Sequence, residues 1–313
     1  MIQGASFSRP DIHAEPGLQA RASNGFNLGL VGYPLSHSLS PRLHAAALAD
    51  SGLEGVYNLY PLSPESVEGD RLQTLLQTMR SGVIDGLNVT IPYKQVVLPM
   101  LDELTSVASA TGAVNTIYRR NGKLVGDNTD VEGFTVDLRR NLEKTGLNWE
   151  NDRLALVLGA GGSARAVVYA LVTAGWGVYL SARRLEQAQS LLESYASKSI
   201  SLSAMPLEAS ALQALLSEKP IDLIVNTTPL GMAPWEGASP WPNEIPLLPG
   251  IFLYDLIYNP PETALLKAAH VAGLRGANGL GMLIEQAALA FERWTGQAPS
   301  RQSMTQAVQS RQL

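Results

Sequence analysis

The 313-residue sequence contains no cysteine and only four histidines. Without cysteine the protein cannot form disulfides, thiolate zinc sites or a cysteine nucleophile. The histidines do not cluster at the spacing of metal ligands, which argues against a structural metal. The sequence also lacks an apolar run of the roughly 20 residues needed to cross a bilayer. We therefore expect no metal and no membrane partner.

Charge of one sign is not concentrated anywhere in the chain. The net charge is −5 and no block of like charges occurs, so a nucleic-acid partner is not expected. Apolar residues make up 45% of the chain, and the length suits two domains. Residues 1–24 are polar and aperiodic, with no apolar core for a secretory signal. We expect these residues to form a flexible tail on a cytoplasmic protein.

Hydrophobic periodicity predicts alternating strands and helices along the chain. In the first half it predicts strands at residues 26–32, 56–60 and 83–89, and a hairpin at 116–125 that turns at Asn121-Gly122. Helices are expected after Ser40-Pro41, with the serine as N-cap, and along the apolar stripe that runs from Leu72 to Met79.

The second half has a cleaner alternation of these patterns. Short apolar runs predict buried strands at residues 154–158, 178–181, 221–225 and 251–254. Helical patterns cover residues 163–174, 185–192 and 282–294. This order predicts an α/β fold with a doubly wound, mostly parallel sheet.

A glycine-rich stretch, Gly159-Ala160-Gly161-Gly162-Ser163, joins a predicted strand to a predicted helix. Glycine allows positive φ and lets the backbone approach a pyrophosphate. The helix start offers free N–H groups and the positive end of the helix dipole. Ala164 replaces the third glycine of the usual Gly-x-Gly-x-x-Gly pattern, so an ordinary turn remains an alternative. The flanking strand and helix favour a dinucleotide site.

The end of the next predicted strand bears on the choice of cofactor. A site for NAD normally places Asp or Glu there, whereas this chain has Ala182-Arg183-Arg184 and no acid until Glu186. Two arginines suit a 2′-phosphate, so NADP(H) is favoured over NAD(H). Solvated surface arginines are the alternative. Thr227 follows another buried strand and could line the nicotinamide ribose or belong only to a turn.

Candidate substrate and catalytic groups lie in the first half. Ser38 and Ser40 flank Leu39 before a helix start, and their hydroxyls with the free N–H groups would suit a carboxylate. A helix cap and a loop serine are the alternative. Lys94 follows an Asn-Val-Thr triplet, and Asp130 ends a Gly-Asp-Asn-Thr-Asp run. A lysine, an aspartate and a nucleotide site in one chain predict proton transfer coupled to hydride transfer, although a lone lysine is usually a surface residue.

A series of ordered motifs resembles the shikimate dehydrogenase family. They occur from about residue 28 to near residue 294 and so cover nearly the whole chain. The motifs are His37-Ser38-Leu39-Ser40-Pro41, Asn88-Val89-Thr90-Ile91-Pro92-Tyr93-Lys94, Gly112-Ala113-Val114-Asn115-Thr116, Gly126-Asp127-Asn128-Thr129-Asp130, Gly159-Ala160-Gly161-Gly162, Asn226-Thr227-Thr228-Pro229-Leu230-Gly231-Met232 and Met282-Leu283-Ile284-Glu285-Gln286.

The resemblance implies reversible NADPH-dependent reduction of 3-dehydroshikimate to shikimate, in a cleft between two α/β domains. It implies that Lys94 and Asp130 are the catalytic pair. The implied substrate-binding residues are Ser38 and Ser40 for the carboxylate, Thr90, Asn115 and Gln286 for the ring hydroxyls, and Tyr258 nearby. The implied cofactor-binding residues are Gly159, Ala160, Gly161, Gly162, Ser163, Ala182, Arg183, Arg184, Thr227 and Gly279.

The resemblance also implies how the chain divides. Residues 25–130 and 279–313 are expected to form a substrate domain, and residues 131–278 a Rossmann-like NADP domain, with Gly279 where the chain returns. One departure from the family is Arg184, followed by Gln187 where the family often has a further arginine. We expect a monomer or a homodimer.

The sequence leaves three alternative functions open. A quinate/shikimate dehydrogenase with broader substrate or NAD use is the nearest, and the missing acid after Ala182 argues against it. A non-catalytic NADP-binding sensor on the same fold is another, which the Lys94 and Asp130 pair disfavours. A domain detached from a bifunctional plant-like enzyme is a third, and nothing beyond the short tail supports it.

Overall fold

The structure, a computed structural model, describes residues 25–64, 69–146, 149, 152–196 and 200–309. The tail expected at residues 1–24 lies outside these described residues. In the described part of the chain, no helix has the length and apolar character to cross a membrane.

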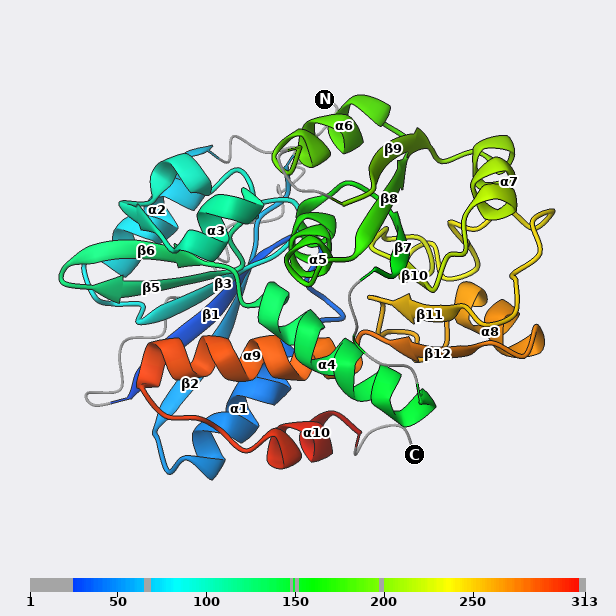
Figure 1. The fold of residues 1–313 in the computed structure, drawn as a ribbon. Coiled ribbons are helices and arrows are strands. Elements are labelled where there is room, and N and C mark those ends of the chain that lie inside the picture. The colour runs from blue at the N-terminus through cyan, green and yellow to red at the C-terminus, as the bar shows by residue number, and fades with distance from the viewer. Residues whose placement is uncertain (1–24, 65–68, 147–148, 150–151, 197–199, 310–313) are drawn as a thin grey trace, which may run out of the picture.

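The N-terminal half builds a six-stranded mixed sheet with the strand order β2-β1-β3-β5-β6-β4 (Figure 1). β1 runs parallel to β2 and β3, while β5 and β6 form the antiparallel hairpin that the sequence predicts. Its turn residues Asn121 and Gly122 both have positive φ, as a tight hairpin turn requires. The strands are β1 (Phe26–Gly32), β2 (Gly55–Pro61), β3 (Gly86–Val89), β4 (Glu103–Leu104), β5 (Thr116–Arg120) and β6 (Lys123–Asp127).

Helices cover both faces of this first sheet because side chains alternate along each strand. Val31 of β1 packs in a cluster with α2 (Gly69–Arg80) and α3 (Ser106–Thr111). Leu28, on the opposite face of β1, packs with α1 (Ser40–Asp50), α9 (Leu280–Thr295) and α10 (Arg301–Gln309). A short 3-10 helix, η1 (Leu98–Met100), precedes β4. β3 starts three residues later than the expected 83–89.

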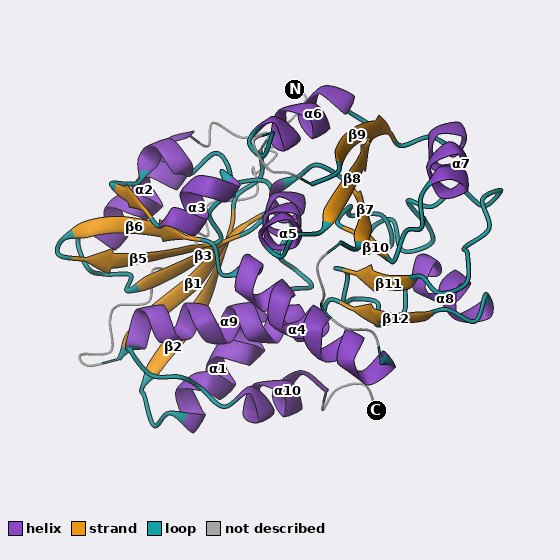
Figure 2. Cartoon of the chain, viewed as in Figure 1, coloured by secondary structure: helices purple, strands orange, loops and turns teal. Residues whose placement is uncertain are grey.

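The second sheet is wholly parallel, with the strand order β12-β11-β10-β7-β8-β9 (Figure 2). The order reverses between β7 and β10, which is the switch point where doubly wound sheets bind ligands. Its strands are β7 (Leu154–Leu158), β8 (Gly177–Ala182), β9 (Leu202–Pro206), β10 (Leu223–Asn226), β11 (Phe252–Asp255) and β12 (Arg275–Asn278). Its helices are α5 (Gly162–Thr173), α6 (Leu185–Glu193), α7 (Ala209–Glu218) and α8 (Ala264–Val271). The α/β prediction is confirmed.

Two long helices connect the sheets. α4 (Asp130–Thr145) leads from the first sheet to the second, and α9 leads back; the two pack side by side (Figure 1). They approach closely because Gly281 has no side chain: an added Cβ would lie 1.9 Å from Asp137 Oδ1. The expected helix at 282–294 corresponds to α9. The sequence reading did not identify α4, although Phe134, Leu138 and Leu142 form its buried stripe.

Candidate active site

A cavity of about 270 Å³ lies where the two sheets and the α4–α9 pair meet. Both halves of the chain contribute to its wall. Of the residues predicted for the site, those lining this cavity are Ser38, Ser40, Thr90, Lys94, Asn115, Asp130, Ser163, Thr227, Tyr258, Gly279 and Gln286. The remaining predicted residues, Gly159, Ala160, Gly161, Gly162, Ala182, Arg183 and Arg184, lie outside this lining.

Lys94 and Asp130 form an ion pair inside the cavity. Lys94 Nζ lies 2.6 Å from Asp130 Oδ2, and their side chains are only 13% and 7% exposed. The ammonium also donates to Ser163 Oγ at 3.2 Å, on the first turn of α5. An ammonium has three N–H groups, so one remains for a ligand after these two contacts. The pair therefore joins the first sheet's loop, the start of α4 and the glycine turn at one point.

Asn115 fixes the position of the Asp130 carboxylate. Its Nδ2 donates to Asp130 Oδ1 at 2.8 Å and to Thr129 Oγ1 at 2.9 Å, and it lies 3.3 Å from Gln286 Oε1. Its Oδ1 accepts from Thr129 N at 2.8 Å. Because Asn115 follows α3 and Gln286 lies on α9, one amide ties three separate segments to the aspartate. Such a network holds its members in a single arrangement.

The start of α1 differs from the prediction for Ser40. The N-cap is Leu39, which makes no side-chain cap, and Ser40 is the first helical residue, with Pro41 in the first turn. The prediction of Ser40 as N-cap is therefore wrong. Ser38 Oγ accepts from Ser40 N at 3.3 Å instead, so the hydroxyl of Ser40 is not used to cap its own helix. Ser38 and Ser40 both face the cavity, as their spacing suggested.

The glycine turn has the geometry that a pyrophosphate needs. Gly159 has a φ of +103°, and an added Cβ would lie 2.7 Å from Thr227 Oγ1. Gly161 is the extended N-cap of α5, with open space where a side chain would be, and the first turn of α5 contains no acidic residue. Free N–H groups at the start of a 12-residue helix therefore face an open approach without an acidic residue in the first turn. These features fit a dinucleotide phosphate.

Arg183 and Arg184 follow β8 and are exposed. Arg184 is the N-cap of α6, while Ala182 ends the strand and is buried. Neither arginine makes an ion pair with another described residue. β8 is the parallel neighbour of β7, so both arginines leave the sheet on the same edge as the glycine turn.

The sequence reading missed Asn88, which lines the cavity from β3. Its Nδ2 donates to Asn115 O at 3.1 Å and to Thr116 Oγ1 at 3.2 Å. Its Oδ1 accepts from the Tyr57 hydroxyl at 2.8 Å. Asn88 belongs to the Asn-Val-Thr triplet that singled out Lys94, so the signal was present in the sequence, but only Thr90 of that triplet was assigned a role.

A buried aspartate holds the other side of the cavity and was also missed. Asp255 is fully buried and accepts from Asn226 Nδ2 at 2.9 Å, Thr263 Oγ1 at 2.6 Å and Ile257 N at 3.1 Å. Burial raises the pKa of its carboxyl group to about 6, against the lowering effect of these hydrogen bonds. The hydrogen bonds set the course of the chain toward Tyr258, which lines the cavity.

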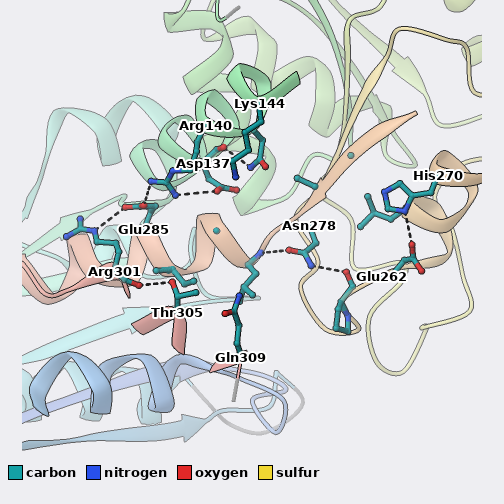
Figure 3. A pocket seen from close by; sticks show the side chains of 18 residues that line it. Asp137, Arg140, Lys144, Glu262, His270, Asn278, Glu285, Arg301, Thr305 and Gln309 are labelled. Atoms are coloured by element: carbon teal, nitrogen blue, oxygen red, sulfur yellow. Dashed lines mark hydrogen bonds and ion pairs between the residues drawn. The ribbon is translucent and has the colours of Figure 1, made fainter. Parts of the chain in front are cut away.

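A second cavity, of about 460 Å³, lies along α4, α8, α9 and α10 and contains an ionic network (Figure 3). Glu285 accepts from Arg140 Nη2 at 2.7 Å and from Arg301 Nε at 3.2 Å. Asp137 Oδ2 accepts from the Tyr254 hydroxyl at 2.6 Å, and burial raises the pKa of the Asp137 carboxyl group. These buried carboxylates already have partners, and they join α4, α9, α10 and β11. No cluster of three or more potential metal-binding side chains occurs among the described residues.

Known proteins resemble this chain along most of its length. The family profile described as "Shikimate dehydrogenase substrate binding domain" matches residues 30–117, and "Shikimate 5'-dehydrogenase C-terminal domain" matches residues 279–309. A shikimate dehydrogenase (NADP(+)) of Carboxydothermus hydrogenoformans is 40% identical over 286 residues, covering 90% of this chain and 95% of the relative.

Solved structures show the same fold. Shikimate 5-dehydrogenase of Thermus thermophilus, in complex with NADP(H) and shikimate, is 36% identical with a TM-score of 0.74, covering 91% of this chain and 99% of the other. Quinate dehydrogenase of Corynebacterium glutamicum, in complex with NAD, is 32% identical with a TM-score of 0.78, over 91% and 99%. Identity at this level over nearly the full length establishes kinship: the chain belongs to the shikimate dehydrogenase family.

Proposed function

We propose that the protein catalyses the reversible NADP-dependent oxidation of shikimate to 3-dehydroshikimate. The observation that carries this proposal is the 2.6 Å pair of Lys94 and Asp130, which lies in a cavity and also contacts Ser163 of the glycine turn. A proton-transfer pair beside a dinucleotide site is what a nicotinamide-dependent alcohol dehydrogenase requires.

The proposed substrate site uses the polar side chains of the same cavity. Ser38 and Ser40 present hydroxyls at the start of α1, which suits the carboxylate of shikimate. Thr90, Asn115 and Gln286 line the same cavity as the Lys94–Asp130 pair and are assigned to the ring hydroxyls, with Tyr258 also in the lining. We assign residues 25–130 and 279–313 to a substrate domain and 131–278 to an NADP domain.

The proposed cofactor site comprises the glycine turn and the end of β8. Gly159, Ala160, Gly161, Gly162 and Ser163 would hold the pyrophosphate, with Thr227 and Gly279 toward the cavity. Arg183 and Arg184, beside Ala182, would bind a 2′-phosphate through charge-assisted hydrogen bonds. Bound NADP(H) supplies the hydride acceptor for the oxidation and the hydride donor for the reduction.

The proposed proton chemistry belongs to the Lys94–Asp130 pair. In the reduction, the ammonium of Lys94 donates to the substrate carbonyl oxygen and stabilises the charge that develops there. Asp130, which is oriented by Asn115, holds the ammonium and can bind an adjacent substrate hydroxyl.

An absorbance assay of shikimate oxidation, with NADP+ and NAD+ side by side, tests the proposal. The wild type is expected to reduce NADP+ with the lower KM. Lys94→Ala is expected to lower kcat by on the order of 100-fold or more, with little change in KM, because the lost interaction strengthens in the transition state. Lys123→Ala, at an exposed lysine of β6, is the matched control. Normal turnover by Lys94→Ala would remove Lys94 from the chemistry.

A second candidate is a quinate/shikimate dehydrogenase, which the similarity to a quinate dehydrogenase favours. The absence of an acid after β8, where Arg183 and Arg184 stand, argues against NAD use. Kinetics with both substrates and both cofactors separate the two functions. Turnover in the same assay would exclude a non-catalytic NADP-binding sensor, because a sensor would not oxidise shikimate.

We further propose that the protein works in the cytoplasm as a monomer or homodimer, without a nucleic-acid or membrane partner. A net charge of −5 without blocks of like charge supports the absence of a polyanion partner. Apart from a second copy of the chain in a homodimer, we expect its partners to be the small-molecule substrate and the cofactor.

A further inference from the structure

Tyr57 lies directly behind the wall of the candidate active site. It extends from β2, and its hydroxyl donates to Asn88 Oδ1 at 2.8 Å. The Ser40 side chain lies near the same phenol and acts to lower its pKa. Asn88 and Ser40 both line the cavity, whereas Tyr57 itself does not. The Tyr57 hydroxyl therefore bonds one cavity residue, on β3, and lies close to a second, on α1.

The direction of these hydrogen bonds follows from the partners of Asn88. Its Nδ2 faces the backbone carbonyl of Asn115 at 3.1 Å, and a carbonyl oxygen can only accept. The Asn88 oxygen must therefore face Tyr57, and the single phenol proton is used on Asn88. Burial raises the pKa of the Tyr57 phenol well above its usual value, so this proton is retained at neutral pH. Tyr57 can then only accept from Ser40, which keeps the Ser40 hydroxyl at the cavity wall. When an anion binds in the cavity, the single Ser40 proton turns from Tyr57 to that anion.

The ring of Tyr57 is held as firmly as its hydroxyl. It stacks on the His44 imidazole with centroids 4.3 Å apart and planes 6° from parallel. His44 lies four residues after Ser40 on α1, so the two side chains share one face of the helix. Trp294 of α9 contacts both rings from the side, and its Nε1 donates to Ile117 O at 2.9 Å. Tyr57 thus lies against the start of α1, with its hydroxyl near Ser40 in the first turn and its ring on His44 in the second.

We propose that Tyr57 is a positioning residue for the substrate, which sets Ser40 for the carboxylate and Asn88 for the ring while touching neither the substrate nor the cofactor. The inference deepens the proposed function and rests on it. It assigns to β2, an edge strand with no residue in the cavity wall, a part in substrate affinity.

The phenylalanine variant of Tyr57 isolates this role. Tyr57→Phe keeps the stack on His44 but removes the donor to Asn88 Oδ1 and the acceptor for Ser40. A buried carbonyl oxygen without a donor can regain one only by rotating the Asn88 amide, which would break its contact with Asn115. We expect the KM for shikimate to rise on the order of tenfold, with kcat and the KM for NADP+ changed less than about twofold. A purely structural role would lower the amount of active enzyme without this split.

Two further variants sharpen the test. Tyr60→Phe removes a phenol from the same strand, three residues on, where the side chain packs in the core on the other face of the sheet, and is expected to leave both KM values unchanged. His44→Ala removes the surface on which Tyr57 stacks and is expected to raise the shikimate KM in the same direction as Tyr57→Phe. If Tyr57→Phe does not yield folded protein, the shikimate KM of His44→Ala tests the proposal in its place.

Calorimetric titration of each variant with shikimate and NADP+ complements the kinetics. Weaker shikimate binding by Tyr57→Phe, with unchanged NADP+ binding, supports the inference. Unchanged shikimate binding, or an equal loss for both ligands, overturns it. If the wild type neither binds nor oxidises shikimate, it is the proposed function that fails, because the variants are then compared against an inactive parent.

Discussion

Acid destabilisation through His44 is a direct consequence of its surroundings. The imidazole is fully buried, and neither ring nitrogen makes a hydrogen bond of normal geometry. Loss of hydration lowers the pKa of His44 from 6.5 to about 3, and the nearby Asn88 side chain opposes this only in part. The folded protein therefore keeps His44 neutral in a pH range where the unfolded chain binds a proton.

The magnitude follows from proton linkage. Between pH 6.5 and about 3 the unfolded state holds one more proton at this position, so the free energy of unfolding falls as the pH falls. The cost is negligible at pH 7, about 2 kcal/mol at pH 5 and about 3 kcal/mol at pH 4. Asp255 works in the opposite direction, because its raised pKa favours the folded state as the pH drops. Only a comparison of variants isolates His44.

His44→Phe removes the titrating group and keeps a ring against Tyr57, Phe291 and Trp294. Urea unfolding of wild type and variant, followed by circular dichroism at pH 7 and pH 5, gives the required difference. We expect the wild type to lose about 2 kcal/mol more than the variant between these pH values. Tyr60→Phe is the control and should follow the wild type, because the pKa of this phenol is raised from 10.0 by burial and the substitution removes no group that titrates between pH 5 and 7. Equal losses in wild type and His44→Phe would refute the account of a buried neutral imidazole.

Other substitutions test separate parts of the structure. Arg183→Ala is expected to raise the KM for NADP+ on the order of tenfold and to leave the KM for NAD+ unchanged in steady-state assays, since a 2′-phosphate contact is lost; equal effects on both would contradict the assignment. Gly281→Ala places a Cβ 1.9 Å from Asp137 Oδ1, so a marked fall in melting temperature is expected, and an unchanged value would show that α4 and α9 separate easily. Asp255→Asn should abolish a loss of stability of roughly 2 kcal/mol that the wild type undergoes as the pH rises from about 4 to 6, because folding raises this carboxyl's pKa; urea unfolding at the two pH values measures it.

Local sequence patterns correctly predicted those strands, turns and helices whose own residues have a strong preference for that structure. The run from β7 through the glycine turn into α5 has apolar strand residues, punctuating glycines and a helical stripe in one short segment, and the Asn121-Gly122 hairpin has a turn that only such residues favour. The helix α4 was overlooked because its sequence begins in a polar motif and includes Gly133 and the buried Asp137. The apolar stripe of α4 could be interpreted only once the structure showed that α4 packs against α9.

The candidate site shows the same division. Lys94 and Asp130 stand out as residue types within motifs, and the structure brings them together. Tyr57 and Asp255 do not, because each acts through a hydrogen bond to a partner about thirty residues away, Asn88 and Asn226. Periodicity reports which face of an element is buried, but it contains no information about which polar groups meet across the fold.

Glu285 and Gln286, which are adjacent on α9, connect substrate specificity to the packing of the helices. These consecutive residues of α9 have different surroundings: Glu285 joins the ionic network with Arg140 and Arg301, and Gln286 approaches Asn115 in the candidate active site. A rotation of α9 that made room for a larger substrate ring would also move the buried Glu285 carboxylate away from Arg140 and Arg301. New specificities should therefore arise by changing side chains on a stationary α9, and laboratory selections for them should leave residue 285 untouched.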